Sequence, residues 1–235
     1  MVTRARTAAL FGALALVSCY DMQELDPGPE HPYLLIDDFE DGDDAETGMM
    51  ASASQFRHMW QAAPFNADNN RGMVHYLEIT PADPSAFALG GEFTFTDPGN
   101  DDFTGVNVGV SNARPLLDAR FFEAIHFTIR FDQGTSRFPS TTKFYVQLGC
   151  DSAPTVNDDG PPWIHGSIMG VSNDWKTLRV RTADLVKPQE QDFVLEGGVT
   201  DCLARVDSVR VTVSTKPRLE EPVTGRLYLD DIYFE

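Results

Sequence analysis

The chain has 235 residues, 42% of them hydrophobic, and its 36 acidic and 18 basic side chains give a formal net charge of −18 at pH 7. This length can bury one core of ordinary size, so we expect one main domain. The acidity argues against a basic patch for nucleic acid or an anionic membrane, because such a patch needs clustered Lys and Arg.

The N-terminal segment MVTRARTAALFGALALVSC has the pattern of a bacterial secretion signal. Arg4 and Arg6 precede an uncharged run that is too short to span a bilayer as a helix. Its end, LVSC, resembles the lipobox, in which the cysteine, here Cys19, is lipidated and becomes the mature N-terminus. We expect a signal peptide over residues 1–18 and, because Tyr20 is not Asp, an outer-membrane lipoprotein. The alternative is an ordinary cleaved signal with an incidental cysteine.

Residues 19–32, which include YDMQELDPGPEHP, are rich in proline and charge, and they indicate an extended stalk before a domain that runs from 33 to 235. Export also bears on the two remaining cysteines, Cys150 and Cys202. An even number of cysteines in an oxidising compartment favours a disulfide. The alternative is a pair of unlinked buried thiols.

The domain begins with LLIDDFEDGDD, residues 34–44, in which a short apolar run passes into acidic residues. An acidic run is usually a solvated loop. The far end of the chain, GRLYLDDIYFE, nevertheless has Asp230 and Asp231 inside an apolar run. If the first and last strands lie side by side, these carboxylates converge on a hard cation, which oxygen ligands suit. An EF-hand is excluded, because its spacing would place Phe39 and Gly48 at ligand positions.

Between these ends, short runs carry apolar residues at every second position and are separated by turns rich in Gly, Pro, Asp and Asn. This pattern predicts an all-β sandwich. The predicted strands are 74–80, 86–96, 105–110, 125–131, 143–148, 175–181, 206–214 and 226–234. Residues 116–122 could form one helical turn.

The alternation in the last predicted strand breaks at its two aspartates. Leu227 and Leu229 share one parity, whereas Ile232 shares the other, so a bulge is predicted that turns one carboxylate inward. Burying that carboxylate would be costly unless it were paired or coordinated.

Four elements, LIDDFEDGD, F-TIRF, DWKTLRVRTADL and GRLYLDDIYF, occur in an order that resembles galactose-binding-like β-sandwich domains. The resemblance is to family 11 carbohydrate-binding modules and complex I intermediate-associated proteins, and it covers about residues 33–235. It implies a jelly roll of two antiparallel sheets with adjoining terminal strands, and Trp175 in the core. It also implies a structural calcium ion held by Glu40 and Asp230, for which Asp38 and Asp231 could substitute.

Motifs for catalysis are absent from the sequence. There is no HExxH, GxSxG or Walker pattern, and the five histidines show no paired metal spacing. Acid pairs are abundant, which leaves a two-carboxylate glycosidase open. We expect no enzymatic activity.

A binding face is predicted where polar residues alternate with the core, because rings and bidentate donors suit sugars. The candidate ligand-binding residues are Tyr145, Arg130, Gln147, Arg210, Trp60 and Trp163. The alternative is an ordinary solvated sheet face. The expected function is a non-catalytic surface lipoprotein that binds a glycan; the rival is a structural or protein-interaction subunit of a bacterial envelope assembly.

Overall fold

The computed structural model describes the strands of the predicted domain and the short segments that join some of them. The described residues are 34–40, 60–64, 72–82, 87–96, 104–111, 116–134, 138–150, 163–187, 198–215 and 222–235. They belong to one structural unit that spans residues 32–235. The predictions for the signal peptide, for Cys19 and for the stalk lie outside the described residues. Within those residues, no helix has the length and apolar character that a membrane span needs.

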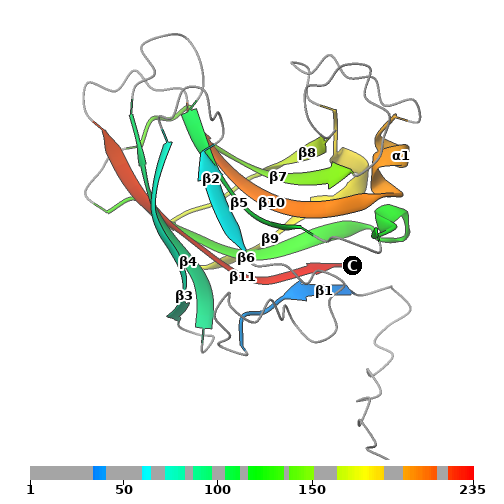
Figure 1. The fold of residues 1–235 in the computed structure, drawn as a ribbon, viewed down its shortest axis with the longest axis horizontal. Helices are drawn as coiled ribbons and strands as arrows, with labels where there is room; N and C mark the ends of the chain where they lie inside the picture. Colours follow the sequence, from blue (N-terminus) through cyan, green and yellow to red (C-terminus); the bar gives the residue numbers. More distant parts are fainter. Residues whose placement is uncertain are drawn as a thin grey trace, which may run out of the picture. The chain divides into compact units, whose positions relative to one another are not determined.

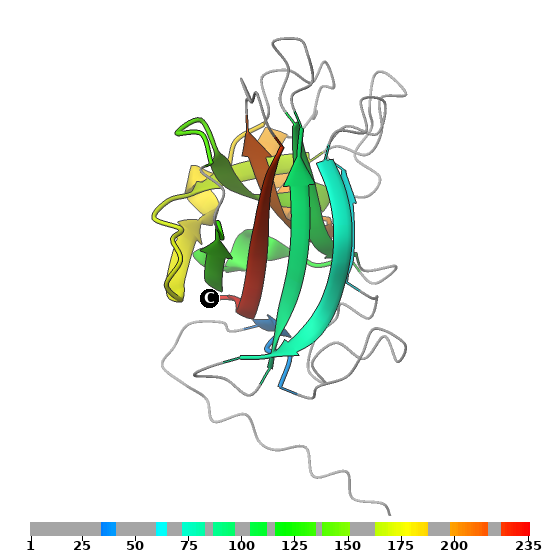
Figure 2. The ribbon, with the colours of Figure 1, turned by 90° about the vertical axis from the view of Figure 1, so that its left-hand side faces the viewer.

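Sheet A, the larger of two sheets, has six strands, all paired antiparallel (Figure 1). Its order is β3 (Gly72–Pro81), β4 (Phe87–Phe95), β11 (Val223–Phe234), β6 (Ala124–Asp132) and β9 (Lys176–Arg181), with β1 (Leu34–Asp37) paired to the end of β11. Figure 2 shows the dark red β11 beside β4 and β3.

Sheet B has five antiparallel strands and lies against sheet A. Its order is β2 (Gln61–Pro64), β5 (Thr104–Ser111), β10 (Val206–Thr215), β7 (Lys143–Cys150) and β8 (Trp163–Ile168). Three short helices accompany the strands: η1 (Ala119–Phe121), η2 (Thr182–Asp184) and α1 (Gly198–Leu203). The predicted all-β sandwich of two antiparallel sheets is confirmed, and η1 lies in the segment expected to make a helical turn.

The core fills the space between the sheets, as the period-two alternation requires. In β10, Val209, Val211 and Val213 are fully buried, and in β6 so are Phe127 and Ile129. Removing a side chain of this size from water contributes about 1.5–3 kcal/mol. The same alternation leaves the intervening residues of each strand on the outer face of its sheet.

The two ends of the domain are neighbours, as expected: Leu34 of β1 lies opposite Phe234 of β11. The predicted bulge is also present, because the pairing of β11 with β6 shifts register between Asp230 and Tyr233. Asp230 is only 2% exposed, whereas Asp231 is exposed and has a φ of 45°. One carboxylate of the pair is therefore buried and the other faces water.

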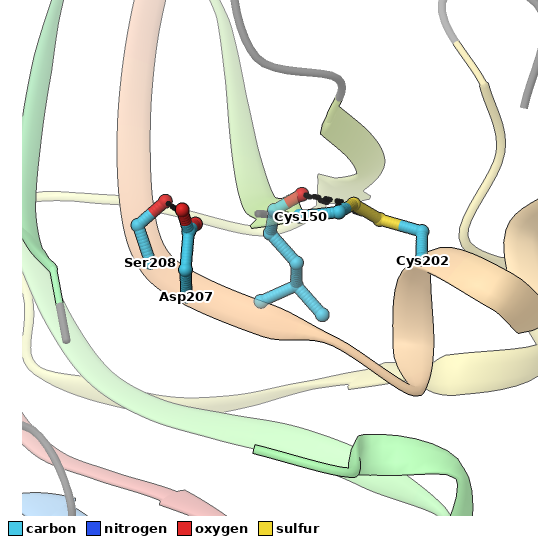
Figure 3. Close-up of a disulfide and its surroundings, with 5 residues drawn as sticks. Cys150, Cys202, Asp207 and Ser208 are labelled. Atoms are coloured by element: carbon cyan, nitrogen blue, oxygen red, sulfur yellow. Dashed lines mark hydrogen bonds between the residues drawn. A yellow bond between two sulfur atoms is a disulfide. The ribbon is translucent and has the colours of Figure 1, made fainter. Parts of the chain in front are cut away.

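A disulfide joins Cys150, at the end of β7, to Cys202 in α1, so the predicted pairing is confirmed over the free-thiol alternative (Figure 3). The two Cα atoms are 5.1 Å apart, and both cysteines are fully buried. The two sulfur atoms lie 3.8 and 3.9 Å from the carbonyl oxygen of Leu148. The bridge therefore ties α1 to one end of sheet B.

Candidate functional site

The outer face of sheet B carries a continuous set of polar and aromatic side chains. Strand alternation places them opposite the valines of the core, and cross-strand pairing brings them together. The set comprises Asn107 of β5, Ser208, Arg210 and Thr212 of β10, Lys143, Tyr145 and Gln147 of β7, and Trp163, His165 and Ser167 of β8. Figure 1 shows β7 and β10 bowed toward sheet A, so their outer face is concave along the strands.

One row of this face crosses sheet B through its central strand. Arg210 lies opposite Gln147, and Gln147 lies opposite His165. The row continues to the exposed Val186, which forms an isolated antiparallel β-bridge with His165 at the edge of β8. Amide, guanidinium and imidazole groups thus lie side by side with an apolar contact at the end of the row.

Three aromatic rings gather on the β7–β8 side of the face. Tyr145 stacks on His165 with ring centroids 5.3 Å apart and an interplanar angle of 9°. Trp163 meets His165 edge-on, with centroids 5.4 Å apart and an angle of 69°. All three residues are half-buried, so part of each remains accessible to water. The cluster offers ring surface that a flat, weakly polar ligand can contact.

The middle of the face is polar, yet it is shielded from water. Thr212 is 0% exposed and Gln147 is 4% exposed, although neither points into the core. Thr212 donates a hydrogen bond to Asn107 Oδ1 at 2.6 Å. At the end of the face, Ser208 donates to Asp207 Oδ1 at 2.9 Å (Figure 3). These bonds fix polar groups in place, which lowers the entropy cost of binding.

Arg210 has no ion pair with a carboxylate among the described residues. Five other described arginines do have one, namely Arg120, Arg179, Arg181, Arg205 and Arg226. The Arg210 side chain lies against Gly109 of the neighbouring strand, where a Cβ atom would overlap Arg210 Cγ. In a chain with twice as many acids as bases, the Arg210 donors are thus not committed to any described carboxylate.

Arg130 does not belong to this face. It lies on β6 in sheet A, so the prediction that grouped it with Tyr145 is wrong. Alternation gives the face of a strand but not the sheet to which that strand belongs. Tyr145, Gln147, Arg210 and Trp163 do share the outer face of sheet B.

Trp60 is also not on this face. It is 7% exposed, its indole nitrogen donates to Asp37 Oδ2 at 2.8 Å, and its ring packs 5.5 Å from that of Phe39. The expected exposed stacking residue is therefore a core residue. Trp175, expected in the core, is instead half-buried beside Tyr228 and Arg130.

The sequence prediction did not count His165 among the candidate ligand-binding residues, because a lone histidine in a strand-like run is more often a surface or satisfied residue than a ligand. The available signal was the alternation of Ile164, Gly166 and Ile168 with His165 and Ser167, in which glycine takes a core position. That glycine makes room: a Cβ at Gly166 would come within 2.5 Å of Val180 Cγ1.

The acidic residues at the two chain ends lie close enough to influence one another. Partial desolvation raises the pKa of Asp231, the charges of Asp38 and Glu40 raise it further, and a hydrogen bond from Thr128 opposes them. Glu40 Oε1 accepts from the Phe87 N–H at 3.5 Å, and buried Asp230 accepts from the Asp231 N–H at 2.9 Å.

Among the described residues, no three His, Cys, Asp or Glu side chains form a group that could hold a metal. The described side chains alone do not make a complete calcium site, and calcium stays a prediction.

Comparison with known proteins identifies the fold. No protein-family model matches the chain, and no curated protein matches it. Among solved structures, it is similar to the family 11 carbohydrate-binding module of the cellulosomal cellulase Lic26A-Cel5E of Clostridium thermocellum, with 15% identity and a TM-score of 0.52 over 88% of this chain and 95% of that one. It is equally similar to the family 11 module from Clostridium thermocellum in complex with a β-1,3-1,4-mixed-linked tetrasaccharide, with 15% identity and a TM-score of 0.53 over 88% of this chain and 96% of that one. The chain therefore has the jelly-roll fold of these modules.

Proposed function

We propose that this protein binds a carbohydrate without catalysis, through the outer face of sheet B. The observation that carries the proposal is the cluster of Tyr145, His165 and Trp163 beside Arg210, which has no carboxylate partner among the described residues. Aromatic rings stack on the C–H face of a sugar, and fixed amide and guanidinium groups hydrogen-bond its hydroxyls. A cluster of aromatic rings of this kind fits a sugar chain better than it fits a compact ion.

The shared fold supports the same class of ligand. A family 11 module with this fold has been solved in complex with a β-1,3-1,4-mixed-linked tetrasaccharide, so the fold can hold a glycan chain. The identity of 15% carries no residue-level assignment. The argument for the individual side chains rests on their own geometry.

The chemistry of the face favours binding over hydrolysis. Glycosidases of the two-carboxylate type hold a pair of Asp or Glu side chains on either side of the scissile bond. The described groups around Tyr145 are rings, amides, hydroxyls, the Lys143 ammonium and a guanidinium, and the carboxylate of Asp207 lies at the end of the face, where it accepts from Ser208. Such groups orient and hold a sugar.

A glycan array probed with the full-length protein tests this function. We expect retention on at least one polysaccharide, and Tyr145→Ala and Arg210→Gln should each weaken it roughly tenfold or more. Arg226→Gln is the matched control, because Arg226 lies on sheet A and pairs with Glu92. If the wild type binds no plant, fungal or bacterial glycan, the rival reading, a structural or protein-interaction subunit of an envelope assembly, takes its place.

A lipid anchor and a structural calcium ion also belong to this proposal. The lipobox-like LVSC supports an anchor on Cys19, which would hold the sandwich at the outer membrane. Cys19→Ala should then leave an unlipidated precursor or a soluble protein, whereas unchanged mass and membrane fractionation would refute the anchor. The repulsion that Asp38 and Glu40 exert on Asp231, next to the buried Asp230, supports a calcium ion that ties β1 to β11.

A further inference from the structure

A second group of aromatic and basic side chains lies on the outer face of sheet A, on the opposite side of the sandwich. Arg130 of β6 and Tyr228 of β11 are directly opposite each other. The guanidinium carbon of Arg130 is 4.5 Å from the ring centroid of Tyr228 and 5.7 Å from that of Trp175. The two rings are themselves 6.1 Å apart. We call these three residues the Arg130 cluster.

Two nitrogen atoms of the Arg130 cluster, Arg130 Nε and Trp175 Nε1, are buried and meet no hydrogen-bond partner among the described residues. A buried N–H group that meets no acceptor has lost its water and gained nothing in return. Here two such donors belong to neighbouring residues. Their coincidence indicates that an acceptor group is missing from this place.

The charge of Arg130 is likewise not balanced. Arg130 has no ion pair among the described residues. On the same sheet, Glu92 accepts from Arg226 at 2.7 Å. Asp132, two residues along the strand, accepts from the Gly134 N–H at 2.7 Å. The missing acceptor should therefore carry a negative charge.

Stacking alone does not account for the cluster. A cation–π contact uses the flat face of the guanidinium and the faces of the Tyr228 and Trp175 rings. It leaves the N–H groups at the edges of the guanidinium and the indole without an acceptor. A purely structural role for Arg130 would thus explain the ring contacts and leave both buried donors unexplained.

We propose that the Arg130 cluster is a second binding site, and that it takes the carboxylate of a uronic acid unit in an acidic polysaccharide. Nε and one Nη of an arginine bind the two oxygens of a carboxylate side by side. The indole N–H supplies a third donor, and the aromatic rings can contact the sugar ring. Because both donors are buried, binding requires the half-buried Trp175, which lies just before β9, to turn its side chain and admit the ligand.

Affinity gels containing polygalacturonate, with neutral galactan as the matched polymer, test this site in the full-length protein. We expect retention on polygalacturonate that weakens as salt is added. Arg130→Gln should weaken it roughly tenfold to a hundredfold, since hydrogen bonds to a charged group are lost. Arg130→Lys should not restore it, because lysine lacks the planar fork. Arg120→Gln, at an arginine that pairs with Asp118 outside the strands of both sheets, should retain wild-type binding.

The indole N–H resonance of Trp175 gives an independent readout. Assigned by its loss in Trp175→Phe, it should move on addition of galacturonate oligomers, because the N–H gains an acceptor. Trp175→Phe keeps a ring and should bind several-fold more weakly, which covers the case in which Arg130→Gln does not fold. The proposal is overturned if wild type ignores polygalacturonate, if Arg130→Gln binds as well as wild type, or if polyglutamate is retained as strongly as polygalacturonate.

Discussion

Single residues decide which aromatic side chains this molecule can offer to a ligand. Asp37 is 4% exposed, and its two carboxylate oxygens accept from the Phe39 N–H at 2.9 Å and from Trp60 Nε1 at 2.8 Å. The carboxylate thereby holds the Trp60 indole in the core, while Trp163, which is half-buried, stays on the surface of sheet B. The residues next to Trp60 in the sequence do not show that Trp60 is buried and Trp163 is not. The partner of Trp60, Asp37, lies 23 residues away along the chain.

Asp37→Ala should lower the free energy of unfolding by about 2–4 kcal/mol, since it leaves two buried N–H groups without acceptors. Urea denaturation followed by far-UV circular dichroism measures the loss. In calcium-free EDTA, Asp38→Ala is the matched control, because the described hydrogen bond of Asp38 is a 3.3 Å contact with the Glu40 N–H at the surface. Equal stability of the two variants would show that Asp37 does not hold Trp60 in place.

Asp231 predicts a pH dependence of known sign. Its pKa is raised above the ordinary value of 3.8 by desolvation and by the charges of Asp38 and Glu40. The native state therefore binds this proton more tightly than the unfolded state. The stability that Asp231 contributes is fully present below pH 3.8 and is lost as the pH rises through its raised value.

Asp231→Asn should consequently be more stable than wild type at pH 7 in EDTA, and the difference should vanish as the pH falls below 4. Asparagine tolerates the positive φ of this position, so backbone strain does not obscure the comparison. Calcium should stabilise wild type by about 3 kcal/mol at a hundredfold excess over Kd, and it should stabilise Asp231→Asn less, because asparagine carries no negative charge. Melting curves of wild type that coincide in calcium and in calcium-free EDTA would end the calcium proposal.

At the scale of elements, the sequence predicted most strands, because period-two alternation is a local signal. The bulge in β11 was also readable, since Leu227 and Leu229 change parity with Ile232 across the aspartate pair. Which strands share a sheet was not readable, because that depends on pairings between distant segments. Tyr145 and Arg130 therefore seemed to form one face, although β7 and β6 lie in different sheets.

The disulfide is the covalent link between elements of sheet B and α1, and it closes a loop with a sequence separation of 52 residues. Replacing Cys150 and Cys202 together by alanine should lower the free energy of unfolding by about 2–5 kcal/mol. Guanidinium denaturation with and without dithiothreitol measures this, and the reductant should leave the double variant unchanged. A wild type whose unfolding midpoint ignores the reductant would contradict a stabilising role for the bridge.

At the scale of the whole molecule, the sandwich has two outer faces with different chemistry. Sheet B offers rings, amides and Arg210, whereas sheet A offers the Arg130 cluster with its two unpaired buried donors. Both arginines lack a carboxylate partner among the described residues of an otherwise acidic chain. This arrangement fits a protein that holds glycans on its surface, and it separates the two proposals by face.

A nuclear magnetic resonance titration of the isotope-labelled protein with its best-bound array glycan tests the central claim most directly. We predict that the amide and side-chain shifts of Tyr145, Gln147, His165 and Arg210 move together and saturate with one affinity, while Tyr233 and Arg226 on sheet A stay unchanged. Shifts confined to sheet A, or no saturable shift on the outer face of sheet B, would contradict the assignment of the glycan to that face.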